Sequence, residues 1–155
     1  MPDPDDVTWL TSDQQRDWRA WLEGVAVIDQ YLDAALRPFG LDLGEYEILV
    51  VLSETPTRSM RMSDVALAVR QSRSRLTHTV TRMETKGLLA RSPSPEDRRG
   101  VIAALTREGM DLLVRAAPTH VRSVRECFID VVDPADFEAI GRAMAAVVGG
   151  GRLAT

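Results

Sequence analysis

The chain has 155 residues, 45% of which are apolar, with a net charge of −4 and one cysteine, Cys127. A chain of this length can bury a sizeable core, and a lone cysteine excludes an intramolecular disulfide framework. No apolar run approaches the roughly 18 residues that cross a membrane, and the acidic start MPDPDD has no signal-peptide character. We therefore expect a cytoplasmic globular protein that does not associate with membranes.

The N-terminal third is predicted to be helical. Ser12 or Asp13 is expected to cap a long helix that runs to about Arg37, where Pro38 and Gly40 end it. At about 25 residues it is longer than the globular mean, so both of its ends need a packing partner, which a second subunit supplies most simply. The elements that follow are a helix over 41–53, a loop over 54–59 and a short helix within 60–69.

The most informative stretch is a basic, hydroxyl-rich helix over residues 72–86. Ser72 is a good N-cap, Gly87 is a stop signal, and an apolar stripe runs between them. Short hydroxyls reach base edges in a major groove, and guanidinium groups bind guanine or phosphate. We predict a recognition helix that contacts double-stranded DNA through Ser72, Arg73, Ser74, Arg75, Thr77, His78, Thr81 and Arg82.

A short hairpin is predicted to follow this helix. Residues 88–92 and 101–105 are strand candidates, and the turn residues between them include two arginines, Arg98 and Arg99. A helix followed by a hairpin with a basic tip is typical of a winged helix-turn-helix. The two arginines are expected to reach the narrow, electronegative minor groove.

Two more helices complete the predicted chain. Thr106 caps a long helix that reaches about Val132, and Asp133-Pro134 begins another that runs to Val148. The fold class is thus mainly α with a small β-hairpin wing. Within a single unit of residues 1–155, we expect a winged-helix DNA-binding lobe (41–106) and a helical dimerisation lobe (12–40 and 106–148).

The net charge hides a strong segregation. Residues 58–107 hold eleven Lys or Arg and four Asp or Glu, a net of +7, whereas the rest of the chain has a net of −11. Eighteen of the nineteen cations are Arg, the side chain better suited to two-pronged contacts with phosphates and bases. Because the local field governs binding to phosphates, the acidic total does not exclude a nucleic-acid partner. The alternative is a charged face that is merely solvated.

These residues resemble the MarR (multiple-antibiotic-resistance-repressor) family of transcriptional regulators. The resemblance spans roughly residues 12–148. It is carried by an ordered set of motifs: Met62–Ala66, Ser72-Arg73-Ser74, Leu76-Thr77, Lys86-Gly87-Leu88, Asp97-Arg98-Arg99-Gly100-Val101, Leu105-Thr106 and Gly109.

The resemblance implies a homodimeric repressor of pseudo-palindromic operators. It implies that Arg99 enters the minor groove and that Asp97 orients it. Relatives often release DNA when a small aromatic or phenolic effector binds between the dimer and DNA-binding regions. Side chains on the helices that line this region in relatives are the candidate effector contacts, although aromatic residues at helical spacing more often belong to a core: Trp18, Trp21, Tyr31, Tyr46 and His120.

Other functions are less consistent with the sequence. Two histidines and one cysteine do not make a metal-ligand spacing, and no cofactor is expected. Cys127 is expected to be a core or interface residue and not a redox sensor. The alternative function is a winged-helix protein-interaction module without operator binding. The exposed face of an interaction helix would present aromatic or aliphatic anchors, whereas residues 72–86 offer mainly Arg, Ser, Thr and His. No Gly-rich phosphate loop or nucleophile–histidine pair indicates an enzyme.

Overall fold

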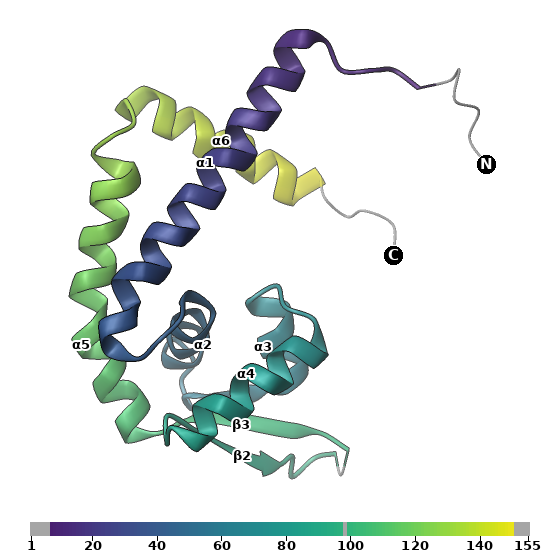
Figure 1. Ribbon diagram of the computed structural model, residues 1–155. Coiled ribbons are helices and arrows are strands. Elements are labelled where there is room, and N and C mark those ends of the chain that lie inside the picture. Colours follow the sequence, from purple (N-terminus) through teal and green to yellow (C-terminus); the bar gives the residue numbers. More distant parts are fainter. Residues whose placement is uncertain (1–6, 98, 151–155) are drawn as a thin grey trace.

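A computed structural model of the chain describes residues 7–97 and 99–150 (Figure 1). It is mainly helical with one small antiparallel sheet, as the sequence predicts. Its elements are α1 (Ser12–Leu36), the 3-10 turn η2 (Arg37–Phe39), α2 (Leu43–Ser53), β1 (Ser59–Arg61), α3 (Met62–Ala68), α4 (Arg73–Thr85), β2 (Leu89–Pro93), β3 (Val101–Leu105), α5 (Arg107–Val124), the π-helical turn η3 (Arg125–Ile129) and α6 (Pro134–Gly150).

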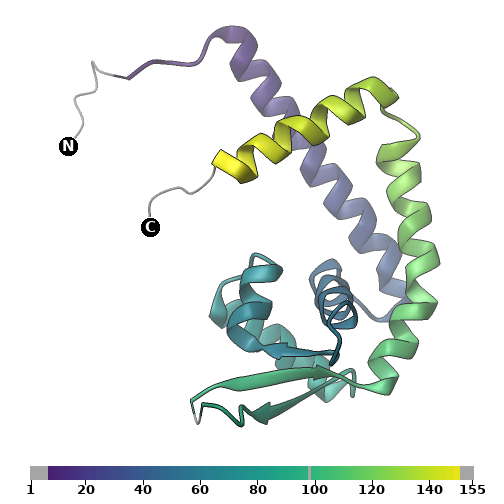
Figure 2. The same ribbon diagram turned by 180° about the vertical axis from the view of Figure 1, so that it is seen from behind.

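The elements form a compact body and a long helical arm (Figures 1 and 2). Helices α2, α3 and α4 gather above the sheet, and the β2–β3 hairpin extends from one side of this body. Helices α1 and α5 contact each other and extend away from the compact body, and α6 overlaps α1 in both views. In the part of the chain that the structure describes, no helix is long and apolar enough to cross a membrane.

The sheet contains one strand that the sequence analysis missed. Its order is β1-β3-β2, and β1 pairs antiparallel with β3 through Ser59 opposite Ala104 and Arg61 opposite Ile102. From the sequence, this segment is expected to be the end of a loop and the start of a helix. Three residues are too few to show a strand period, so only the tertiary pairing defines β1.

Helix ends follow local capping rules, with small shifts from the predicted bounds. Helix α1 is capped by Thr11, whose hydroxyl accepts from Gln14 N–H, and not by Ser12 or Asp13. Asp42 caps α2 in the same way, so α2 begins at Leu43, two residues later than predicted. The cap predicted at Thr106 is confirmed. Helix α6 runs to Gly150, since glycine weakens a helix without forbidding it.

The core lies in the compact body. The predicted stripe of α4 is confirmed, because Leu76, Val80 and Met83 are each at most 1% exposed. They belong to the same buried cluster as Ile48 and Leu49 of α2. This packing holds one face of α4 against the body and leaves its other face to the solvent.

The long helices, by contrast, carry many exposed apolar side chains. Those of α1, α5 and α6 that are more than a third exposed include Trp18, Leu22, Val25, Val27, Val114, Val121, Phe137, Val147 and Val148. Scattered apolar residues are normal on a protein surface, but a set this large on the three long helices is typical of an association surface.

Candidate DNA-binding surface

Helix α4 presents a polar face away from the core. Ser72 is its N-cap, and the Ser72 hydroxyl accepts from Arg75 N–H at 3.2 Å. Ser74, His78 and Thr81 are exposed on the face opposite the apolar stripe. All eight predicted contact residues of this helix are therefore exposed at its surface, namely Ser72, Arg73, Ser74, Arg75, Thr77, His78, Thr81 and Arg82.

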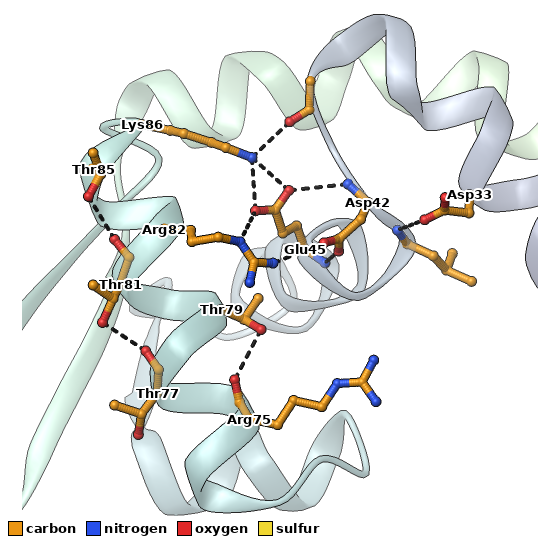
Figure 3. Close-up of polar contacts among 12 residues, drawn as sticks. Asp33, Asp42, Glu45, Arg75, Thr77, Thr79, Thr81, Arg82, Thr85 and Lys86 are labelled. Carbon is orange, nitrogen blue, oxygen red and sulfur yellow. Dashed lines mark hydrogen bonds and ion pairs between the residues drawn. The ribbon is translucent and has the colours of Figure 1, made fainter.

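The threonines of α4 make hydrogen bonds within the helix (Figure 3). The hydroxyls of Thr77, Thr81 and Thr85 each donate to the carbonyl four residues earlier, at 2.8, 2.8 and 3.0 Å. With the hydroxyl proton engaged, each oxygen can only accept, as from an adenine or cytosine amino group. The methyl groups remain able to contact thymine. These threonines are therefore expected to contact the amino groups of adenine or cytosine and the methyl group of thymine.

Arg82, the eighth predicted contact on α4, is held toward α2. Its guanidinium donates to Asp42 Oδ2 at 3.0 Å and lies 3.6 Å from Glu45 Oε1. A side chain engaged in two ion pairs is less available to DNA than we expected from its position in the sequence. Arg75, which precedes it by two turns, has no ion pair within the described residues, and its side chain points away from the others in Figure 3.

Beside Arg82 lies a buried ion pair that the sequence analysis did not identify. Glu45 is 2% exposed, and both of its carboxylate oxygens accept from Lys86 Nζ at 2.8 Å. Lys86 also donates to the carbonyl of Gly40 at 2.9 Å. The signal available in the sequence was Asp42-x-x-Glu45, the pattern of a capping box, which predicts where α2 begins but not its partner on α4.

The wing differs from the expected arrangement around Asp97. The Asp97 carboxylate accepts from the backbone N–H of Arg99 at 3.0 Å, not from its guanidinium. Its other oxygen lies 3.8 Å from the guanidinium of Arg61, which also donates to Glu96 at 3.0 Å. Asp97 therefore shapes the turn and links it to β1, while the Arg99 side chain is exposed. Arg98, the second predicted wing contact, lies outside the described residues.

A second ion pair attaches α4 to the wing. Glu84 accepts from the Arg91 guanidinium at 2.7 and 3.0 Å and from its backbone N–H at 3.1 Å. These hydrogen bonds hold the pKa of Glu84 below its usual value. The recognition helix and the first wing strand are thus joined by a carboxylate that stays ionised.

A small cavity lies between α1, α2, the turn before α4, and α5. It measures about 300 Å³ and is mostly apolar, with Tyr46, Val50, Arg70 and His120 in its lining. The rings of Tyr46 and His120 are 4.3 Å apart. Nδ1 of His120 is buried and has no hydrogen-bond partner among the described residues, and burial lowers the pKa of this histidine. The cavity therefore has an imidazole whose protonation is disfavoured by burial and a guanidinium in its lining.

Only two of the five candidate effector residues line this cavity. These are Tyr46 and His120, whereas Trp18 lies on the first half of α1 beside the N-terminal segment. Trp21 is partly buried outside the cavity lining, and the Tyr31 hydroxyl donates to Glu126 at 3.0 Å. Val50 and Arg70 also line the cavity, although nothing in the sequence predicts that they lie beside Tyr46 and His120.

Cys127 lies in the π-helical turn η3 and is partly buried. Burial raises the pKa of its thiol. A reactive cysteine needs the opposite shift, toward the thiolate. The geometry supports the expectation that Cys127 is a packing residue.

Together, the fold and the α4 surface define a winged helix-turn-helix protein. A family model described as the MarR family matches residues 39–100. The HTH-type transcriptional regulator PecS of Dickeya dadantii (strain 3937) is 33% identical over 101 residues, which make up 64% of this chain and 61% of PecS. The match thus covers less than two thirds of that relative's length.

Solved structures extend the likeness to nearly the whole chain. AbsC, a MarR family transcriptional regulator from Streptomyces coelicolor, is 43% identical with a TM-score of 0.87, over 94% of this chain and 99% of AbsC. Sco3205, a MarR family regulator from the same organism solved in complex with DNA, is 36% identical with a TM-score of 0.90, over 97% and 94%. The chain belongs to the MarR family of transcriptional regulators.

Proposed function

We propose that the protein is a cytoplasmic homodimeric repressor that binds a pseudo-palindromic operator and is released by a small aromatic or phenolic effector. The observation that carries the DNA-binding function is the exposed hydroxyl, histidine and arginine face of α4 beside a basic-tipped wing. This is the arrangement in which a helix enters the major groove and a hairpin follows the adjacent minor groove. The DNA complex of the relative Sco3205 supports the same partner for this chain.

The proposed dimer rests on the apolar surface of the long helices. Trp18 and Leu22 of α1, and Val147 and Val148 of α6, are about half exposed or more in a single chain. Helices of this length have apolar faces that the compact body does not cover. A second copy packed against α1, α5 and α6 would bury them and divide the chain into a DNA-binding lobe and a dimerisation lobe.

The proposed effector site is the cavity at Tyr46 and His120. A cavity of about 300 Å³ is at the lower end of the range for small-molecule sites. Its apolar walls suit an aromatic ring, and His120 in its lining has an Nδ1 with no hydrogen-bond partner among the described residues. Arg70, in the turn between α3 and α4, would be the partner of an acidic group on the effector, in competition with Asp29 and Glu47, which also line the cavity. A ligand there would touch both the arm and the helix-turn-helix.

The dimer should bind its operator with the spacing of a two-fold structure. We expect light scattering to give twice the chain mass at micromolar concentration, from an interface on the order of 2,000 Å². Footprinting on the DNA upstream of the gene should reveal two half-sites with centres about 10 base pairs apart. A stable monomer, or a single isolated half-site, would contradict the proposal.

Filling the cavity should abolish the effector response without affecting DNA binding. Val50→Phe places a ring beside Tyr46, whereas the matched variant Val50→Ala leaves the cavity open. In a thermal-shift screen of hydroxybenzoates and phenols, a ligand at about 100 times its Kd should raise the Tm of the wild type and of Val50→Ala by about 5–10 °C. Val50→Phe should show no shift and keep its operator affinity. An equal shift in all three proteins would place the effector elsewhere.

A further inference from the structure

A cluster of charged contacts joins three helices at the end of α4 (Figure 3). Lys86 uses all three of its N–H donors, two on Glu45 and one on the Gly40 carbonyl that follows η2. Arg82 adds ion pairs to Asp42 and Glu45. We call this set the α1–α2–α4 clamp; its members are Asp33, Gly40, Asp42, Glu45, Arg82 and Lys86.

The clamp extends to the long helix of the arm. Asp33 of α1 accepts from the backbone N–H of Leu43, the first residue of α2, at 3.1 Å. Glu45, two residues after Leu43, closes the capping box of α2 by accepting from Asp42 N–H at 3.1 Å. The first turn of α2 therefore has polar contacts both with α1, through Asp33, and with the last turn of α4, through Asp42 and Glu45.

We propose that the α1–α2–α4 clamp is a positioning device for DNA binding, which fixes the recognition helix relative to α1 and so sets the spacing between the two recognition helices of the dimer. This inference rests on the proposed function, because spacing has meaning only when two copies read one operator. Glu45 and Lys86 are its central positioning residues, and neither needs to touch DNA.

Apolar packing alone does not supply such positioning. The core beneath α4 buries Leu76, Val80 and Met83, but apolar contact is non-directional and permits small rotations of one helix on another. Charge-assisted hydrogen bonds are directional, and a buried carboxylate tolerates no arrangement that leaves it unpaired. Glu45 is 2% exposed and Lys86 is its partner on α4. Movement of α4 against α2 would separate this pair, and the free-energy cost of leaving a buried charge unpaired opposes that movement.

The sign of the change in operator affinity in the variant Glu45→Gln distinguishes a positioning role of the clamp from a purely electrostatic one. Neutralising a carboxylate of the DNA-binding lobe and freeing Lys86 should tighten binding if only charge matters. If the clamp positions α4, operator affinity should fall about tenfold, the equivalent of one mismatched base pair, while affinity for an unrelated duplex stays equal or rises. Inserting one base pair between the half-sites of the operator should also weaken binding by Glu45→Gln less than it weakens binding by the wild type.

The measurements are made by fluorescence anisotropy on the full chain, at a temperature where each variant is folded by circular dichroism. Glu54→Gln is the matched control, since it makes the same change at the other end of α2, where the described residues offer Glu54 no ion pair. Lys86→Gln is the second variant: the new amide can still donate to Glu45, and Arg82 Nε lies 3.6 Å from Glu45 Oε1, so the buried carboxylate keeps hydrogen-bond and charge partners. The ratio of operator to non-operator affinity of Lys86→Gln should fall by a similar factor.

The outcomes distinguish the clamp from the function on which it rests. Unchanged or tighter operator binding by Glu45→Gln, with the insertion penalty intact, would show that the clamp contributes stability alone. An unchanged affinity ratio in Lys86→Gln would have the same meaning. A wild-type protein that is indifferent to the inserted base pair would instead overturn the dimeric operator-binding function, and the role of the clamp with it.

Discussion

Replacing Gly109 by alanine should lower the free energy of unfolding by about 3 kcal/mol, among the largest effects of any single methyl group in this chain. A Cβ at this position would lie 2.2 Å from the carbonyl oxygen of Leu88 and 2.8 Å from a methyl carbon of Leu105. The Leu88 carbonyl cannot retreat freely, because it accepts hydrogen bonds from both the backbone N–H and the hydroxyl of Thr106. The first turn of α5 would have to move away from the wing.

Thermal or urea unfolding at a fixed chain concentration measures this change. About 3 kcal/mol corresponds to a fall in Tm of about 6–12 °C for a domain of this size. Gly149→Ala is the control, because the added methyl meets nothing within 4 Å and alanine favours the helix. Gly149→Ala should be neutral or slightly stabilising. Equal stabilities of the two variants would mean that α5 does not approach Leu88 closely.

Gly109 also illustrates what could be predicted from this sequence. The sequence identifies Gly109 only as part of a family motif, and the structure supplies the physical reason, which is the close approach of α5 to the Leu88 carbonyl. Features encoded by neighbouring residues were predicted well: the Ser72 cap, the apolar stripe of α4, the hairpin and the Thr106 cap. Each depends on residues within one or two turns of each other, where capping and periodicity operate.

Contacts between distant residues could not be predicted in this way. Glu45 and Lys86 are 41 positions apart, and Arg61 is 35 positions from Glu96. The sequence shows that each residue is charged, but not which opposite charge folding brings beside it. For the same reason Arg82 was assigned wholly to DNA, and β1, which exists only through its pairing with β3, was missed.

The wing and the recognition helix should contribute to DNA binding in different ways. Arg99 is exposed at the hairpin tip and has no core role. Arg99→Ala should weaken binding to all sequences about equally and reduce the salt dependence by roughly one unit per subunit, because it removes one phosphate or minor-groove contact. Affinities for operator and unrelated DNA, measured over a series of salt concentrations, give both quantities. A loss confined to the operator would assign base recognition to the wing.

His78 and Thr77 provide the comparison on α4. His78→Ala or Thr77→Ala should cost ~1–3 kcal/mol at one or two operator positions and little elsewhere. The engaged hydroxyl of Thr77 sharpens this expectation, since its oxygen can only accept and its methyl group favours thymine. Binding to a set of single-base operator variants would locate the affected positions. A uniform loss across the set would mean that these side chains contact only the backbone.

Asp97→Ala tests whether the shape of the wing matters more than its charge. The variant removes a negative charge from a surface that approaches DNA, so electrostatics alone predicts tighter binding. It also removes the hydrogen bond to Arg99 N–H and the ion pair at 3.8 Å with Arg61, which together hold the turn on β1. We expect operator affinity to fall by part of the loss seen for Arg99→Ala, because the arginine would no longer be presented by a fixed turn. Tighter binding by Asp97→Ala would mean that the aspartate has no orienting role.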